Sequence, residues 1–181
     1  MKKLITILAL AVAIPSIVNA QGTVNFSSTS AAHVIQVNNV SVASGFATVG
    51  LYWGALGSTD SQLVLIGSTV LNGAGGGING GLRTTGTATA GGTSGTFQVR
   101  AWTGGFATYE AAVASGNSSI LAGTSSVFSN PTGNPAGTPP TAPANLTGWI
   151  AAVQLTPVPE PSTIALGILG AGSLLFLRRK K

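Results

Sequence analysis

The chain has 181 residues, contains no cysteine and has one histidine. This excludes disulfide bridges, thiolate chemistry and a zinc site of ordinary ligand type. Of the eight Lys and Arg residues, two lie in the first three positions and four are the last four, so segment 21–157 keeps two cations against two carboxylates. Two carboxylates are too few for a conventional calcium site, and nucleic acid is bound mainly through Lys and Arg. We therefore expect no metal, no cofactor and no nucleic-acid partner.

The N-terminus has the pattern of a secretory signal peptide. Two lysines precede an eleven-residue, mainly apolar run at 4–14, which Pro15 interrupts. A basic start, a short apolar run and small residues before the junction predict cleavage between Ala20 and Gln21. A first transmembrane helix is the alternative, but it needs about 20 apolar residues. Residues 1–20 are therefore predicted to be a signal peptide.

The C-terminal segment 158–181 combines a proline-flanked glutamate, a short apolar run and a basic end. Proline and the residue before it disfavour helix, so the tripeptide is expected to be extended and exposed. A helix over 164–177 rises about 21 Å, less than the roughly 30 Å of a bilayer core, and its cations are expected to stay on the cytoplasmic side. The residues assigned to these parts are Pro159, Glu160 and Pro161 for the exposed tripeptide; Ile164, Leu166, Ile168, Leu169, Leu174, Leu175, Phe176 and Leu177 for the membrane anchor; and Arg178, Arg179, Lys180 and Lys181 for the cytoplasmic stop.

This order of features resembles the PEP-CTERM sorting signal of exported bacterial proteins. The resemblance implies that an integral-membrane cysteine protease of the exosortase type recognises the tripeptide and removes the anchor. It also implies two processing partners, signal peptidase and the exosortase, and a transient stay in the inner membrane before release to the cell envelope or an extracellular matrix. A simple tail-anchor helix after a chance Pro-Glu-Pro is the alternative. Blocks 22–26, 99–102 and 109–112 are also similar to uncharacterised PEP-CTERM proteins of Verrucomicrobia, which implies no activity.

The segment 21–157 is predicted to form one all-β domain, an antiparallel β-sandwich or jelly-roll-like fold with one short helix. Period-two apolar patterns and turn-rich separators dominate, without an extended helical repeat. The Thr108–Ser115 segment is the helical candidate, with Thr108 as its cap. The predicted strands are 23–26, 33–37, 46–53, 62–66 with a continuation at 70–71, 96–102, 126–128 and 146–155, and the predicted loops are 73–81 and 130–143.

Few residues are suited to catalysis. A triad of His33, Asp60 and a serine lacks the Gly-x-Ser-x-Gly turn that would expose a nucleophile. Asp60 and Glu110 are the two carboxylates available for glycoside cleavage. We therefore expect that the protein is not an enzyme. Instead, Arg100 and Glu110 are predicted to form an ion pair that holds the helix against its strand.

The aromatic residues leave two interpretations open. Buried, they fill the core; exposed in a row, they would stack on sugar rings. The residues concerned are Tyr52, Trp53, Trp102, Tyr109 and Trp149. The first functional hypothesis is an exported structural or interaction protein that associates with exopolysaccharide, with polysaccharide as a candidate partner. The alternative is a carbohydrate-binding module with exposed aromatics, and a hydrolase is the third hypothesis.

Overall fold

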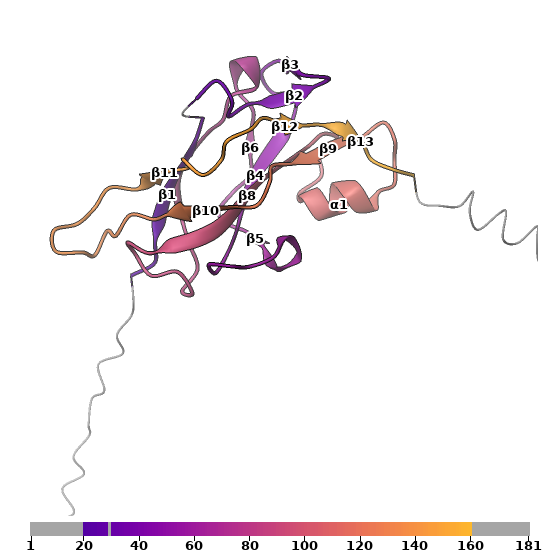
Figure 1. The fold of residues 1–181 in the computed structure, drawn as a ribbon. Helices are drawn as coiled ribbons and strands as arrows, with labels where there is room; N and C mark the ends of the chain where they lie inside the picture. The colour runs from indigo at the N-terminus through magenta and orange to yellow at the C-terminus, as the bar shows by residue number, and fades with distance from the viewer. Residues whose placement is uncertain (1–19, 29, 161–181) are drawn as a thin grey trace, which may run out of the picture.

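The computed structural model describes residues 20–28 and 30–160 (Figure 1). This part of the chain is mostly β-structure with one short α-helix, as predicted. The elements are β1 (Thr23–Ser27), β2 (Ile35–Val37), β3 (Val40–Ser41), β4 (Thr48–Gly54), η1 (Asp60–Gln62), β5 (Val64–Leu65), β6 (Val70–Leu71), η2 (Ala74–Gly76), β7 (Asn79–Thr84), β8 (Ser94–Trp102), α1 (Tyr109–Ala114), β9 (Leu121–Thr124), β10 (Phe128–Pro131), β11 (Ala144–Asn145), β12 (Val153–Gln154) and β13 (Thr156–Pro157). The predicted signal helix and C-terminal membrane helix fall outside the described residues. Within them, no helix has the length and apolar character that a membrane span requires.

The antiparallel pair of β4 and β8 forms the centre of the fold. It lies in a seven-stranded sheet with the order β13-β9-β8-β4-β5, in which β10 also pairs with β8 and β6 with β4. Two three-stranded sheets, β11-β1-β7 and β12-β2-β3, complete the described structure. Two pairings are parallel, β1 with β11 and β2 with β12, which departs from the predicted antiparallel arrangement. Parallel neighbours need long connections, and here the last strands of the domain return beside the first ones.

The central pair is buried on both faces because its side chains alternate between two apolar clusters. On one face Leu51 and Val99 pack in the larger core with residues of β1, β2 and β12. On the other face Tyr52 and Trp102 pack with Ala112 of α1. The strand predicted at 46–53 is therefore confirmed as β4, and it is buried on both faces.

The helix prediction is confirmed with its cap. α1 begins after Thr108, whose hydroxyl oxygen accepts a hydrogen bond from the Ala111 N–H at 3.2 Å. Ala112 is fully buried against the central sheet. A helix of six residues is marginal alone, so its packing on the sheet is what maintains it.

The predicted closing strand at 146–155 is wrong. Most of that stretch is irregular, with a turn at 147–148, and the strand pairing there is limited to β12, with β11 just before the stretch and β13 just after it. The cause is the fully buried Asn130. Its amide donates to the Asn145 carbonyl at 3.0 Å and its amide oxygen accepts from the Gly148 N–H at 3.0 Å. These bonds satisfy backbone groups that a continuous strand would pair with a neighbour.

Other boundaries also differ from the sequence prediction. Strand β9 was not predicted, the strand expected at 126–128 is shifted to β10, and Gln62 belongs to η1 instead of the next strand. The predicted glycine-rich loop at 73–81 contains η2, and its last three residues begin β7. Glycine disfavours strands, but a Cβ on Gly80 would overlap the Phe26 ring. Close packing of β7 on β1 therefore selects glycine there.

Two adjacent glycines in η2 offer a matched test of this tight packing. Gly75 and Gly76 both have positive φ, but a Cβ on Gly75 would meet open space, whereas one on Gly76 would overlap the Ile35 carbonyl oxygen. We expect Gly75→Ala to cost about 1–2 kcal/mol from backbone strain alone. Gly76→Ala should cost about 1–3 kcal/mol more because backbone atoms must move. Denaturant unfolding of both variants measures the difference, and equal costs would contradict the packing argument.

Candidate functional site

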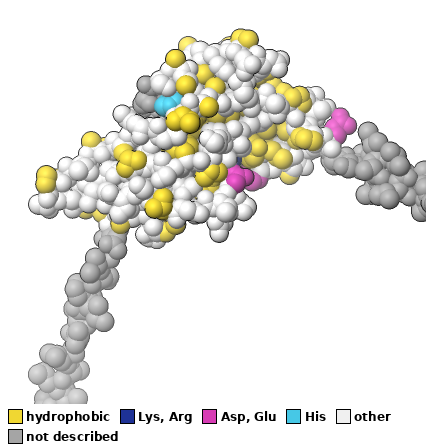
Figure 2. Space-filling view, viewed as in Figure 1, with side chains coloured by type: hydrophobic (Ala, Val, Ile, Leu, Met, Phe, Trp, Pro, Cys, Tyr) yellow, Lys and Arg dark blue, Asp and Glu magenta, His cyan; other side chains and the backbone are white. Residues whose placement is uncertain are grey.

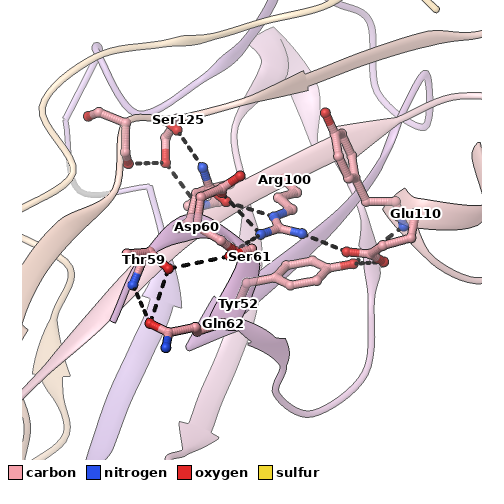
Figure 3. Close-up of polar contacts among 12 residues, drawn as sticks. Tyr52, Thr59, Asp60, Ser61, Gln62, Arg100, Glu110 and Ser125 are labelled. Carbon is pink, nitrogen blue, oxygen red and sulfur yellow. Dashed lines mark hydrogen bonds and ion pairs between the residues drawn. The ribbon is translucent and has the colours of Figure 1, made fainter. Parts of the chain in front are cut away.

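The side chain of Arg100 is the centre of the polar cluster on the helix-covered face of the sheet (Figure 3). It projects from β8 and its side chain is 7% exposed. Its guanidinium donates to Glu110 Oε1 at 2.6 Å, to Asp60 Oδ1 at 3.1 Å and to the Asp60 carbonyl at 2.9 Å. Its Nε donates to Gln98 Oε1 at 2.7 Å. The predicted ion pair between Arg100 and Glu110 is confirmed, and Asp60 of η1 joins it.

Two tyrosines enclose the same guanidinium. Its carbon lies 4.1 Å from the centre of the Tyr52 ring and 5.4 Å from that of Tyr109. The Tyr52 hydroxyl donates to Glu110 Oε2 at 2.9 Å and accepts from the Tyr109 N–H at 3.3 Å. Burial raises the pKa of Tyr52 well above its ordinary value, and the hydrogen bond to Glu110 adds to this. The Tyr52 hydroxyl therefore keeps its proton and donates it in the hydrogen bond to Glu110.

Beside this cluster lies a pocket of about 440 Å³. The carboxylates of Asp60 and Glu110 stand at it with side chains 65% and 55% exposed. Its lining residues are Tyr52, Asp60, Ser61, Leu63, Val64, Leu65, Arg100, Thr108 and Glu110. Chemically, the pocket offers hydrogen-bond acceptors beside aliphatic side chains. Residues 20–28 and 30–160 contain no group of three His, Cys, Asp or Glu side chains placed to hold a metal ion.

The residues considered for catalysis are distributed over two faces of the sheet. The two carboxylates considered for glycoside cleavage do come together, but Arg100 binds both. His33 is buried and its ring stacks on Trp149 with centroids 4.7 Å apart. Trp149 belongs to the larger core, on the face opposite to that of Arg100. The structure therefore does not assemble the triad of His33 and Asp60.

The tryptophans belong to the core. Trp53, Trp102 and Trp149 are all buried. Their indole N–H groups donate to Thr89 Oγ1 at 3.1 Å, to the Phe106 carbonyl at 2.8 Å and to the Ala151 carbonyl at 2.6 Å, respectively. With Tyr52 also buried, the core interpretation is confirmed. The exposed aromatic row of the carbohydrate-binding alternative is wrong for the described part of the chain.

The predicted sorting tripeptide begins where the fold ends. β13 pairs with β9, placing Thr156 opposite Ala122. Val158 follows it, is 3% exposed and donates its N–H to the Ile120 carbonyl at 2.8 Å. Pro159 and Glu160 are exposed. The remaining predicted sorting and anchoring residues, Pro161 and the segment 164–181, lie outside the described residues.

The glutamate of the tripeptide also contacts the domain. The Ser118 hydroxyl, in the loop between α1 and β9, donates to Glu160 Oε1 at 3.0 Å. The sequence gives no signal of this contact, because the two residues are 42 positions apart. Glu160 is thus held against the folded domain.

The predicted signal-cleavage junction lies at the other margin of the fold. The Ala20 carbonyl accepts from the Gly91 N–H at 2.6 Å, and Gln21 forms an antiparallel bridge with Ala90. A mature chain that begins at Gln21 would therefore keep its first residue at the edge of the β-structure. The cleavage itself stays a prediction.

In the structure, the β-rich domain leads directly into the exposed Pro159 and Glu160. Residues 157–181 match the family model described as the PEP-CTERM protein-sorting motif. The chain therefore carries a PEP-CTERM sorting motif at its C-terminal end, and this motif implies an exported, envelope-associated protein processed by exosortase-type machinery. No curated protein and no solved structure matches it. The resemblance to verrucomicrobial proteins stays a prediction.

Because two carboxylates share Arg100, we expect their removal to have non-additive effects on the free energy of unfolding. We expect Asp60→Asn and Glu110→Gln each to lower the free energy of unfolding by about 0.5–1.5 kcal/mol. The double variant should lose about 1 kcal/mol more than the sum, because a buried guanidinium then has no anionic partner. Denaturant unfolding of the four proteins in this double-mutant cycle measures the coupling. Additive losses would show that the two ion pairs are independent.

Proposed function

We propose that this protein is cargo for export, processed at both ends. Signal peptidase cleaves between Ala20 and Gln21, the C-terminal helix then anchors the chain briefly in the inner membrane, and an exosortase-type protease cleaves at the Pro159–Pro161 tripeptide. The domain is then released to the cell envelope or extracellular matrix. The observation that carries this proposal is the sorting-motif match at 157–181, which starts at the last strand of the described fold.

In this proposal the domain has a structural or interaction role and is not an enzyme. Its few charged side chains are used within the fold: Arg100 is bound by two carboxylates, and Arg83 is buried and donates to the carbonyls of Gly80, Leu82 and Ser68. A buried cation with such partners supports the local fold instead of contacting phosphate or substrate. Because Arg83 and Arg100 are used within the fold, we expect no nucleic-acid partner.

The finer proposal is that the released domain associates with exopolysaccharide. On the visible face, backbone and side chains that are neither charged nor hydrophobic cover most of the described surface, with scattered hydrophobic side chains (Figure 2). Such a surface offers many hydroxyl and amide groups for hydrogen bonds with sugars. With the tryptophans buried, the saccharide site that we propose is the pocket beside Asp60 and Glu110, where carboxylates can accept hydrogen bonds from sugar hydroxyls.

The processing proposal predicts dependence on Glu160. Intact mass of the protein recovered from cells that contain the exosortase-type protease should show loss of the C-terminal segment, and cells without it should retain the segment. Glu160→Gln should keep the segment in both strains, since the protease loses the carboxylate of its recognition tripeptide. The same substitution at Glu110, far from the tripeptide in sequence, is the control and should leave cleavage intact. Cleavage of Glu160→Gln at the rate of the unchanged chain would refute the proposal.

Association with polysaccharide predicts a binding equilibrium that is insensitive to salt. Co-sedimentation of the released domain with the exopolysaccharide of its own cells should change less than about twofold between 50 and 500 mM NaCl, because ion-pair attraction is screened over this range whereas neutral hydrogen bonding is not. Loss of co-sedimentation at high salt would contradict association through an uncharged surface. No co-sedimentation at any salt concentration would dismiss the polysaccharide role.

A further inference from the structure

The last described strand joins the sorting tripeptide to the folded domain. Thr156 and Pro157 pair with Ala122 and Leu121 of β9. The Val158 N–H is bonded to the Ile120 carbonyl, and the Val158 side chain is buried in the cluster that includes Trp102. The chain is therefore bound to the domain up to Val158, the residue before the tripeptide.

The contact of Glu160 with Ser118 extends this docking into the tripeptide itself. Glu160 is exposed, so water competes with the hydrogen bond, and the contact adds to the docking without fixing it. Leu155 marks the opposite limit of the docked segment. It is almost fully buried in the larger core and its N–H donates to the Gln36 carbonyl at 2.8 Å. Detachment of residues 156–160 would therefore remove Val158 from the smaller cluster around Trp102 but leave the larger core closed.

Docking conflicts with recognition by a protease at the membrane. Proteins that recognise extended peptides commonly pair with several consecutive backbone groups, and those of 156–158 are already engaged. Val158 and the predicted start of the anchor at Ile164 are six positions apart, which is at most about 20 Å of extended chain. With β13 docked, the protease would have to fit between the folded domain and the bilayer within that reach.

We propose that the folded domain itself regulates its sorting. Residues 156–160, here called the strap, dock on β9 and Ser118 through β13 and Glu160, and the protease acts on the state in which the strap has detached. Ser118 and the edge of β9 thus form the surface that keeps the tripeptide from the protease. The rate of anchor removal then scales with the detached fraction. This inference rests on the proposed exosortase processing.

A disulfide staple tests the proposal directly, because the chain has no cysteine of its own. Ala122 and Thr156 are directly opposed in an antiparallel pair, a separation that a disulfide can span. Purified full-length Ala122→Cys/Thr156→Cys is incubated with membranes that contain the protease, in its oxidised and its reduced form. We expect the oxidised form to be cleaved at least about tenfold more slowly, with the reduced form and both single variants cleaved at the rate of the unchanged chain.

A loosening variant gives the opposite test. Ser118→Ala removes the hydrogen bond to Glu160 and should raise the initial cleavage rate about two- to tenfold. The neighbouring Ser119→Ala is the matched control, since its hydroxyl is not a partner of Glu160. Hydrogen exchange at the Val158 amide, measured without the protease, should accelerate in Ser118→Ala and slow in the oxidised staple.

The outcomes separate the two proposals. Equal cleavage of the oxidised and reduced staple would overturn the detachment requirement while leaving exosortase processing intact. A rate for Ser118→Ala equal to that of Ser119→Ala would overturn the part assigned to Ser118. If the unchanged chain itself keeps its C-terminal segment in the presence of the protease, the processing proposal fails independently.

Discussion

The described fold depends on the antiparallel pair of β4 and β8, which is buried on both faces. Seven consecutive residue pairs join the two strands, from Thr48 with Trp102 to Gly54 with Thr96. One face closes the larger apolar core, and the other receives α1, η1 and the polar cluster around Arg100. Because β9 pairs with β8 and β13 pairs with β9, the last described strand forms an edge of the sheet that contains this buried pair.

Arg100 explains how so few charges can matter structurally. A buried guanidinium has a high desolvation cost unless anions and hydrogen-bond acceptors surround it. Two carboxylates, one glutamine and two tyrosine rings meet that need and bring together a strand, a 3-10 turn and a helix. The consequence is a surface on which the carboxylates of the cluster are partly exposed while their cation is buried.

The sorting signal is continuous with the fold in a physical sense as well as in sequence. Export signals are usually considered as separable segments, but here the residues just before the tripeptide complete a β-sheet, and Glu160 bonds to the domain. In the docking proposal, the equilibrium between docked and detached β13 therefore determines both the stability of that sheet edge and the accessibility of the signal. A domain of this kind could delay its own release until its last strand detaches.

The sequence predicted what depends on local chemistry: the β-rich fold, a capped helix at 108–115, strands at the places of β1, β4 and β8, and a sorting segment at 158–181, which the family model matches at 157–181. It also predicted the pairing of Arg100 with Glu110, because charges are so scarce that few partners exist. It failed where long-range contacts decide the backbone. The break in strand pairing at 146–152 follows from Asn130, and β7 has glycine at position 80 because the Phe26 ring leaves no room for a Cβ there.

Asp60 as the second partner of Arg100, the burial of the tryptophans and the docking of Glu160 on Ser118 were likewise decided by the tertiary structure. Each of these contacts joins residues at least about 40 positions apart or depends on which face of a sheet is covered. Local sequence patterns determine strands, caps and signals because those involve neighbouring residues. Partners that meet only when the chain folds back on itself are determined by the packing of the whole domain.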